Sequence, residues 1–330
     1  MRQSSDIRYL SPDLLQSLQL TPQQIALSIE HLLLGRQRQQ VWNAPKAVIT
    51  PPDGRYMMAT LAAADDPPFL AVKALVLNPD NPKHGLASIN ALVTLLDSRS
   101  GLPLAVLDGN WVTAVRTAGL SAVAAKRLAR PDAVVAAFIG CGVQAHSHLQ
   151  AFAALFPLKR VHAFGRGTAS RDAFCRSVEK MGLAAVASKT AQEAICDADL
   201  IVTSVTLSPQ LIPFLDARWL KPGAFVTMTD LAAPWLADSL SVLDRIIVDD
   251  LEQEASMPKP LVDPALVRGD LTRLVTGDAA GRGTESERTA FVFRGLALGD
   301  LAVAALAYQR ACECSPGALA GDQERTGRLD

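Results

Sequence analysis

The chain has 330 residues, of which 49% are hydrophobic, and a formal net charge of -1 from 32 basic and 33 acidic side chains. Its isoelectric point near 6.5 gives no basic field for nucleic acid or an anionic membrane, so we expect neither as a partner. The cysteines form no CxxC pair or metal-ligand spacing, no apolar run reaches about 18 residues, and the start lacks a signal-peptide pattern, so we expect a cytoplasmic protein without a metal.

The first part of the chain, up to about residue 130, mixes helices with a run of strands. Within residues 7–40 we predict a short strand and then two helices, with Ser11 and Thr21 as their N-caps. Glycine and proline punctuation then predicts strands at 46–50, 55–62, 69–77, 91–97 and 102–108. A helical pattern over 111–128, with a stripe of small residues, closes this α+β part.

Strands and helices alternate in the second part of the chain. Apolar strands are predicted at 133–140, 160–165, 184–188, 200–205, 224–229 and 245–250. Such alternation favours an α/β, doubly wound parallel sheet, because parallel neighbours need crossover helices. Helices are predicted at 254–260 and, as one long element, at 287–313, whereas the tail 315–330 has no periodicity and is expected to be disordered.

The turn after the strand at 133–140 has the spacing of a dinucleotide-binding loop. Gly140 permits a tight turn, Gly142 lets the backbone approach a pyrophosphate, and Ala145 is small enough for the next helix to pack on the strand. The N-terminus of that helix offers free N–H groups to the phosphates. The spacing alone is a weak signal, but a strand precedes it and a helix follows it, which favours the cofactor reading.

The residues after the strand at 160–165 bear on which dinucleotide binds. A site for NAD places an acid there on the ribose diol, but this chain has Arg166 and no carboxylate before Asp172. A missing acid and an arginine favour a 2′-phosphate, so we expect NADP(H), with NAD(H) also possible. The alternative is that Arg166 stacks on adenine or is solvated.

Several segments together resemble the ornithine cyclodeaminase and mu-crystallin family. They are residues 69–109, residues 107–128, IGCGVQA at 139–145 and FVFRGLALGDLAVAALAYQRA at 291–311, and the resemblance covers about residues 41 to 313. It implies a substrate-binding and dimerisation domain of residues 1–130, completed by a C-terminal helix at about 303–314, and a Rossmann dinucleotide-binding domain of residues 131–302. It also implies a homodimer that acts on a small amino or imino acid.

The resemblance assigns cations to the substrate. Lys73 and Arg116 fall on the family's ligands for the substrate carboxylate, with Lys73 also among its catalytic residues, and Lys46 stands where the family usually has an arginine. A guanidinium can bind a carboxylate bidentately, and the lysine at 46 keeps the charge without that fork geometry. Without the resemblance, a lone lysine or arginine would more often be a surface residue or part of an ion pair.

Asp230 matches the family's catalytic aspartate. It follows an apolar strand at its carboxyl end, where open α/β sheets hold their ligands, and a carboxyl group there can exchange a proton with an imine or amine. The alternative is that Asp230 caps a helix over 231–240. The family often continues with proline and glycine after this aspartate, whereas this chain has Leu231 and Ala232, which leaves the geometry of the loop open.

Four further residues match family positions at the cofactor. Gln144 and Thr117 fall near the cofactor phosphates, and Thr203 and Ser204 end the strand that the nicotinamide half crosses. These four matches are weaker indications than the cations and Asp230.

Three functions compete. The first is an NAD(P)H-dependent reductase of pyrroline-2-carboxylate or a related ketimine; the second is an ornithine cyclodeaminase, which converts L-ornithine to L-proline and ammonia with bound NAD; the third is a non-enzymatic binder of NADPH or a small ligand. Cyclodeaminases carry a glutamate for the distal amine where this chain has Met57 and Met58. A mere binder does not need Lys73, Arg116 and Asp230 together. The reductase is therefore the leading hypothesis.

Overall fold

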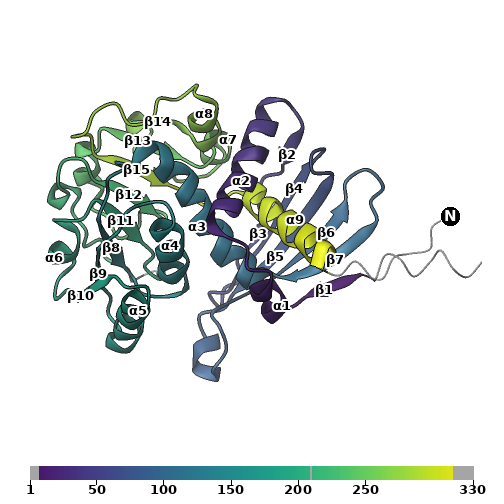
Figure 1. The fold of residues 1–330 in the computed structure, drawn as a ribbon, viewed down its shortest axis with the longest axis horizontal. Helices are drawn as coiled ribbons and strands as arrows, with labels where there is room; N and C mark the ends of the chain where they lie inside the picture. Colours follow the sequence, from purple (N-terminus) through teal and green to yellow (C-terminus); the bar gives the residue numbers. More distant parts are fainter. Residues whose placement is uncertain (1–6, 209, 315–330) are drawn as a thin grey trace, which may run out of the picture.

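The computed structural model describes residues 7–208 and 210–314, which form two sheets with helices packed on them (Figure 1). Sheet A belongs to the first part of the chain and sheet B to the second. The predicted fold class, an α/β parallel sheet together with an α+β part, is confirmed.

Sheet A is mixed, with the strand order β1-β7-β6-β5-β4-β2 and β3 paired to β4. Only the β1–β7 pair is parallel. Its strands are β1 (Arg8–Leu10), β2 (Val41–Asn43), β3 (Ala47–Ile49), β4 (Tyr56–Ala64), β5 (Phe69–Leu77), β6 (Ile89–Asp97) and β7 (Pro103–Asp108). The helices of this part are α1 (Pro12–Ser17), α2 (Pro22–Gln37), the short 3-10 helix η1 (Asn81–His84) and α3 (Gly109–Leu128). Ser11 and Thr21 cap α1 and α2 as predicted.

Sheet B is entirely parallel, with the strand order β10-β9-β8-β11-β12-β15-β13-β14. Its strands are β8 (Val135–Ile139), β9 (Arg160–Phe164), β10 (Ala184–Ala187), β11 (Leu200–Thr203), β12 (Phe225–Met228), β13 (Arg245–Val248), β14 (Val267–Asp270) and β15 (Thr289–Val292). The connecting helices are α4 (Val143–Ala153), α5 (Thr168–Lys180), α6 (Ala191–Ile195), α7 (Leu251–Ala255) and α8 (Leu271–Thr276), with 3-10 turns η2 (Ala217–Trp219), η3 (Ala237–Val242) and η4 (Pro264–Leu266). From β8 the chain adds β9 and β10 on one side of the sheet and then crosses back to add β11 on the other side. The topological switch point therefore lies between β8 and β11, and such sheets bind ligands at this position.

The end of the chain differs from the prediction of one helix over 287–313. Thr289–Val292 forms strand β15, which inserts between β12 and β13. Helix α9 (Ala297–Cys314) begins only after Gly295, whose φ of +97° is not a helical angle. All four residues of β15 are buried, and a short run buried on all sides has no periodicity that separates a strand from a helix. The predicted boundary at 302 and 303 therefore falls inside α9, and the tail 315–330 lies outside the described residues.

Two other predicted helices were wrong. The helix expected at 254–260 is α7, which starts earlier because the Asp250 side chain accepts hydrogen bonds from the first backbone N–H groups, and which ends before Pro258. No helix follows Asp230 directly, because Leu231 and Ala232 both adopt left-handed φ angles, 59° and 57°, in a turn. Asp230 is thus not a helix cap.

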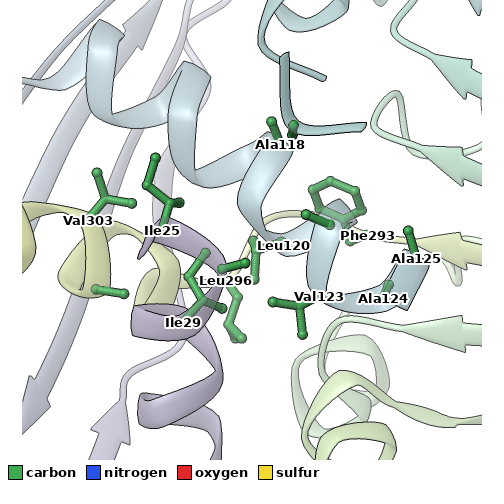
Figure 2. Close-up of a cluster of buried hydrophobic side chains, with 14 of the residues drawn as sticks. Ile25, Ile29, Ala118, Leu120, Val123, Ala124, Ala125, Phe293, Leu296 and Val303 are labelled. Carbon is green, nitrogen blue, oxygen red and sulfur yellow. The ribbon is translucent and has the colours of Figure 1, made fainter. Parts of the chain in front are cut away.

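Helix α3 connects the two sheets and is buried along most of its length. Figure 2 shows Leu120 and Val123 of α3 packed toward Ile29 of α2 and Leu296 at the start of α9, while Phe293 reaches the helix from the end of β15. The small residues of α3 allow this approach, since a Cβ on Gly119 would lie 2.6 Å from the Ile29 side chain. A residue on α3 is consequently fixed relative to both sheets.

Among residues 7–208 and 210–314, helices cover one face of sheet A. Helix α9 crosses β4, β5 and β6, and α3 packs on β6 (Figure 1). Within residues 7–208 and 210–314, no helix has the length and apolar character that a membrane span requires.

Candidate active site

The glycine loop after β8 borders a cleft of about 550 Å³ at the carboxyl edge of sheet B. Gly140 has a φ of +96°, and a Cβ there would lie 2.5 Å from the Ser204 carbonyl oxygen, so only glycine fits. A Cβ on Gly142 would meet nothing within 4 Å and would project into open space. The cleft, here called the glycine-loop cleft, is lined among others by Gly140, Gly142, Gly165, Arg166, Ser170 and Ser204.

Helix α4 starts directly after this loop. Its N-cap, Gly142, has no side chain to occupy the first N–H groups, which are therefore free for an anion. The Gln144 Oε1 atom is buried without a partner, and Ala145 is fully buried where the helix packs on the sheet. The residues present fit the pyrophosphate of a dinucleotide. Thr117, in contrast, lies on α3 and donates its hydroxyl to the Thr113 carbonyl at 2.7 Å.

The opposite side of the glycine-loop cleft is basic and lacks an acid. Arg166 and Ser170 line it, and α5 begins at Thr168 with Gly167 as an N-cap that makes no side-chain hydrogen bond. Asp172 lies within α5, as expected, and pairs with Arg171 at 3.0 Å. A 2′-phosphate would thus meet free N–H groups and the Arg166 charge.

Neighbouring strands of sheet B deliver polar residues to one edge in order. Thr203 ends β11 and Ser204 follows it, Asp230 lies two residues past β12, Arg294 lies two past β15, and Asp249 comes directly after β13. The β12–β15 register pairs Met228 with Val292, so Asp230 and Arg294 leave the sheet at the same level, one strand spacing of roughly 5 Å apart.

Asp230 is almost fully buried at this edge. One carboxylate oxygen accepts the Thr203 hydroxyl at 2.9 Å and the other accepts the Val205 N–H at 3.0 Å. Burial raises the pKa of Asp230 to about 6, and the hydrogen bonds from Val205 and Thr203 oppose that rise. A carboxyl with a pKa near neutrality can give or take a proton under ordinary conditions.

Sheet A presents two lysines to the same region from its inner face, the face that α9 covers. Lys73 on β5 pairs in register with Thr60 on β4, and the β3–β4 register brings Lys46, directly before β3, opposite Thr60 as well. Because side chains alternate along a strand, all three point to one face. Arg116 comes from α3, and Lys46, Lys73 and Arg116 are here called the cation cluster.

Asp300, on the first turn of α9, joins two members of the cation cluster, Lys73 and Arg116. Its Oδ1 atom lies 2.8 Å from Lys73 Nζ, and its Oδ2 atom accepts the Thr60 hydroxyl at 3.2 Å. Arg116 Nε lies 3.0 Å from Oδ1 as an ion pair, but its N–H is not directed well enough for a hydrogen bond. The two cations lower the pKa of Asp300 and keep it ionised, although burial alone would raise the pKa.

Asp300 is not among the site residues predicted from the sequence, although the sequence carries a usable signal for it. It is an isolated acid in the apolar run LALGDLAVAAL, and a buried charge of that kind requires a partner.

The cation cluster retains positive charge after this pairing. Burial is the main cause that lowers the pKa of Lys73 and of Lys46 to about 8, and the neighbouring cations lower it further. Lys46 Nζ donates to the Arg294 carbonyl at 2.7 Å, and Arg116 Nη1 is buried without any partner. A Cβ on Gly295 would lie 2.7 Å from that Nη1 atom, so glycine leaves the guanidinium its room. Unpartnered donors and surplus charge suit a bound carboxylate.

The structure therefore brings Lys46, Lys73 and Arg116 together and leaves Asp230 apart from them. The pKa of Asp230 responds to burial and to its own hydrogen bonds, and none of the three cations is among its causes. Gly295, three residues past β15, lies against Arg116, so Arg116 reaches the edge of sheet B from which Asp230 also extends.

Metal chemistry has no site among the described residues. Within residues 7–208 and 210–314, no group of three or more His, Cys, Asp or Glu is arranged to hold a metal ion.

The chain matches the model of the ornithine cyclodeaminase/mu-crystallin family over residues 16–315. A delta(1)-pyrroline-2-carboxylate reductase from Bacillus cereus is 31% identical over 75% of this chain and 79% of its own.

Two solved structures have the same fold. The delta(1)-pyrroline-2-carboxylate reductase of Thermococcus litoralis, in complex with NADH and L-proline, superposes with a TM-score of 0.87 at 26% identity, over 94% of this chain and 98% of its own. An archaeal alanine dehydrogenase dimer with bound NAD gives a TM-score of 0.84 at 27% identity, over 94% and 97% of the two chains.

Proposed function

The chain belongs to the ornithine cyclodeaminase/mu-crystallin family, and from that membership we propose that it reduces the C=N bond of a small imino acid with a nicotinamide cofactor. The observation that carries the proposal is the cation cluster. Lys73 and Arg116 share one buried carboxylate, Asp300, Lys46 lies beside them against the Arg294 carbonyl, and a protonatable Asp230 follows a neighbouring strand of sheet B. This arrangement suits a substrate that bears a carboxylate next to a reducible C=N bond.

Each residue has a separate role in this reaction. The cation cluster binds the substrate carboxylate and so fixes the orientation of the C=N carbon, with buried Lys73 as one of its members. Asp230 gives a proton to the imine nitrogen, and as a carboxylate it stabilises an iminium. A nicotinamide bound along the glycine-loop cleft supplies the hydride. Gly140, Gly142 and Ser204 line that cleft and would form the wall beside the cofactor, with Gln144 next to them on α4, whereas Ala145 and Thr203 are fully buried and support this wall from behind.

Ornithine cyclodeaminase is disfavoured by the inner face of sheet A. Met58, which pairs with Leu75, points inward next to Thr60, while Met57 pairs with Val76 and points outward. The inward methionine offers no charge to a distal amine. Only Met58, and not Met57 as the sequence suggested, thus occupies the position that decides this point.

We expect Asp230→Asn to reduce kcat for pyrroline-2-carboxylate reduction by about a hundredfold or more, because a positioned acid contributes that much. The amide keeps an oxygen for the Val205 N–H, so melting temperature and cofactor affinity should change little. Steady-state kinetics and thermal melting on one preparation measure both. Asp238→Asn, at an exposed site nearby, is the control, and turnover of the Asp230 variant close to wild type would remove the proton-transfer role.

The pH profile gives the same test a second readout. Asp230 is protonated below about pH 6, so kcat/KM for imine reduction should fall as the pH rises through 6, and amine oxidation should rise over the same interval. A second fall is expected above about pH 8, where Lys46 and Lys73 lose the protons that attract the carboxylate. Asp230→Asn should abolish the first transition and keep the second.

NADP(H) is the cofactor we propose as preferred over NAD(H). Arg166→Ala should weaken NADPH binding by about tenfold and leave NADH binding nearly unchanged, because a charged contact to the 2′-phosphate is lost. Fluorescence titration with both cofactors measures the two constants. Arg176→Ala removes the same charge from an exposed position on α5 and should have no effect. Tighter binding of NADH by the wild type would contradict the assignment.

We also propose a homodimer that pairs through the outer face of sheet A, so that residues 1–130 and α9 form a substrate-binding and dimerisation domain. Leu61, Val76 and Leu92 are exposed on that face, with Leu92 at 49%, and a groove of about 660 Å³ runs along it. No described helix covers these side chains. Exposed apolar patches of this kind mark protein interfaces.

Light scattering at low micromolar concentration should give about twice the 35.1 kDa chain mass. Leu92→Glu places a charge in the proposed interface and should shift the protein toward the monomer. Leu27→Glu, at an equally exposed position on α2, should leave the mass unchanged. A monomeric wild type would contradict the proposal.

A further inference from the structure

The inner face of sheet A continues beyond the cation cluster toward a second charged group. Along β4, Thr60 stands opposite Lys73, Met58 opposite Leu75, and Tyr56 opposite Leu77, all on the inner face. A substrate whose carboxylate lies at the cation cluster would extend its side chain along this row. We place Arg294 at the far end of this row, because its carbonyl accepts Lys46 Nζ at 2.7 Å and because the pKa of the half-buried Tyr56 hydroxyl, which burial raises, is lowered by the Arg294 charge.

Arg294 is joined to the cation cluster through its backbone. Its carbonyl accepts Lys46 Nζ at 2.7 Å, its N–H donates to Asp249 Oδ2 at 3.2 Å, and Gly295, the next residue, abuts Arg116. The backbone is therefore held at the substrate site, and the side chain is only 13% exposed. A buried guanidinium so close to the cation cluster must be neutralised or must bind an anion.

Glu254, on the short helix α7, neutralises it. Arg294 Nε lies 2.8 Å from Glu254 Oε2, and Nη2 lies 3.4 Å from Oε1 and donates to the Lys259 carbonyl. Glu254 is itself only 12% exposed and also accepts the Leu261 N–H. Helix α7 is fixed from the other side, because Arg36 of α2 binds Asp250 at 2.8 Å and Glu252 at 3.2 Å.

We propose that the Arg294–Glu254 pair sets the class of side chain that this site accepts, and that it selects an uncharged one. The pair is neutral as a unit, so the distal end of the row attracts neither the second carboxylate of a dicarboxylic imino acid nor the amine of a diamino acid. Met58 and Leu75 line the path with apolar atoms, which suits a hydrocarbon chain or ring. The inference rests on the proposed function, because it assigns the substrate carboxylate to the cation cluster.

The pair predicts opposite effects for its two members. Glu254→Gln keeps the shape and the acceptor for Leu261 but leaves Arg294 positive, so a ligand with a second carboxylate should gain affinity. Arg294→Gln leaves Glu254 negative, so a ligand with a distal amine should gain affinity. A merely structural ion pair would weaken all ligands alike in both variants.

The test uses competitive inhibition of pyrroline-2-carboxylate reduction by butanoate, succinate and 4-aminobutanoate, which share one carboxylate and differ at the far end. In Glu254→Gln, the inhibition constant of succinate relative to butanoate should fall about tenfold or more, as a charge-assisted contact would produce. In Arg294→Gln, the inhibition constant of 4-aminobutanoate relative to butanoate should fall by a similar factor. Glu252→Gln, an exposed acid on the same helix, should change neither ratio.

Failure of this inference differs from failure of the proposed function. If the wild type reduces no imino acid, the proposed function is wrong. If it reduces pyrroline-2-carboxylate but both ratios stay within twofold of wild type, the pair does not determine specificity. The double variant Glu254→Gln with Arg294→Gln should return to the wild-type ratios, and a gain for succinate that persists there would also overturn the inference. Either single variant is enough to test whether the pair determines specificity. If one of them does not fold, the other still gives the answer.

Discussion

The contact of Asp300 with Lys73 and Arg116 is the interaction on which the rest of the site depends. It joins a strand of sheet A, the helix between the sheets and the last helix of the chain through one buried carboxylate. Without that carboxylate, two cations would be buried with no counter-charge, which is strongly destabilising. With it, the cluster still has more positive than negative charge, and Arg116 still has an unpartnered donor. This surplus charge and the free donor are why we propose that the cluster binds the carboxylate of the substrate.

The topology explains how that place meets the cofactor. Sheet B delivers its glycine loop, Asp230 and Gly295 at the ends of neighbouring strands, and sheet A delivers its lysines from the facing surface. Helix α3 fixes the distance between the two, because its small residues let α2 and α9 pack closely on it. In the function we propose, the cluster holds the carboxylate and Asp230 donates the proton to one substrate, and in our further proposal Arg294 and Glu254 meet its far end.

Much of this arrangement could be read from the sequence, and the parts that could not have physical reasons. The glycine loop, the alternating strands and the caps at Ser11 and Thr21 are local patterns, and local patterns are legible. Strand β15 was mistaken for helix because a short run buried on all sides carries no periodicity. Asp300 could have been suspected as a lone acid in an apolar run, but its partner Lys73, like the partner of Arg294, lies far away in the sequence and is identified only by the fold. The contacts across the two sheets are the part that only the fold supplies.

The central claim is that the cation cluster binds the substrate carboxylate. The most direct test of it alters the protein side of that contact and the substrate side together. It compares kcat/KM of the wild type and of Arg116→Met on pyrroline-2-carboxylate and on 2-methyl-1-pyrroline, in which a methyl group replaces the carboxylate. The wild type should prefer the carboxylate by about a hundredfold or more, and the variant should lose at least about tenfold of that preference. Equal preference in both proteins would contradict the account.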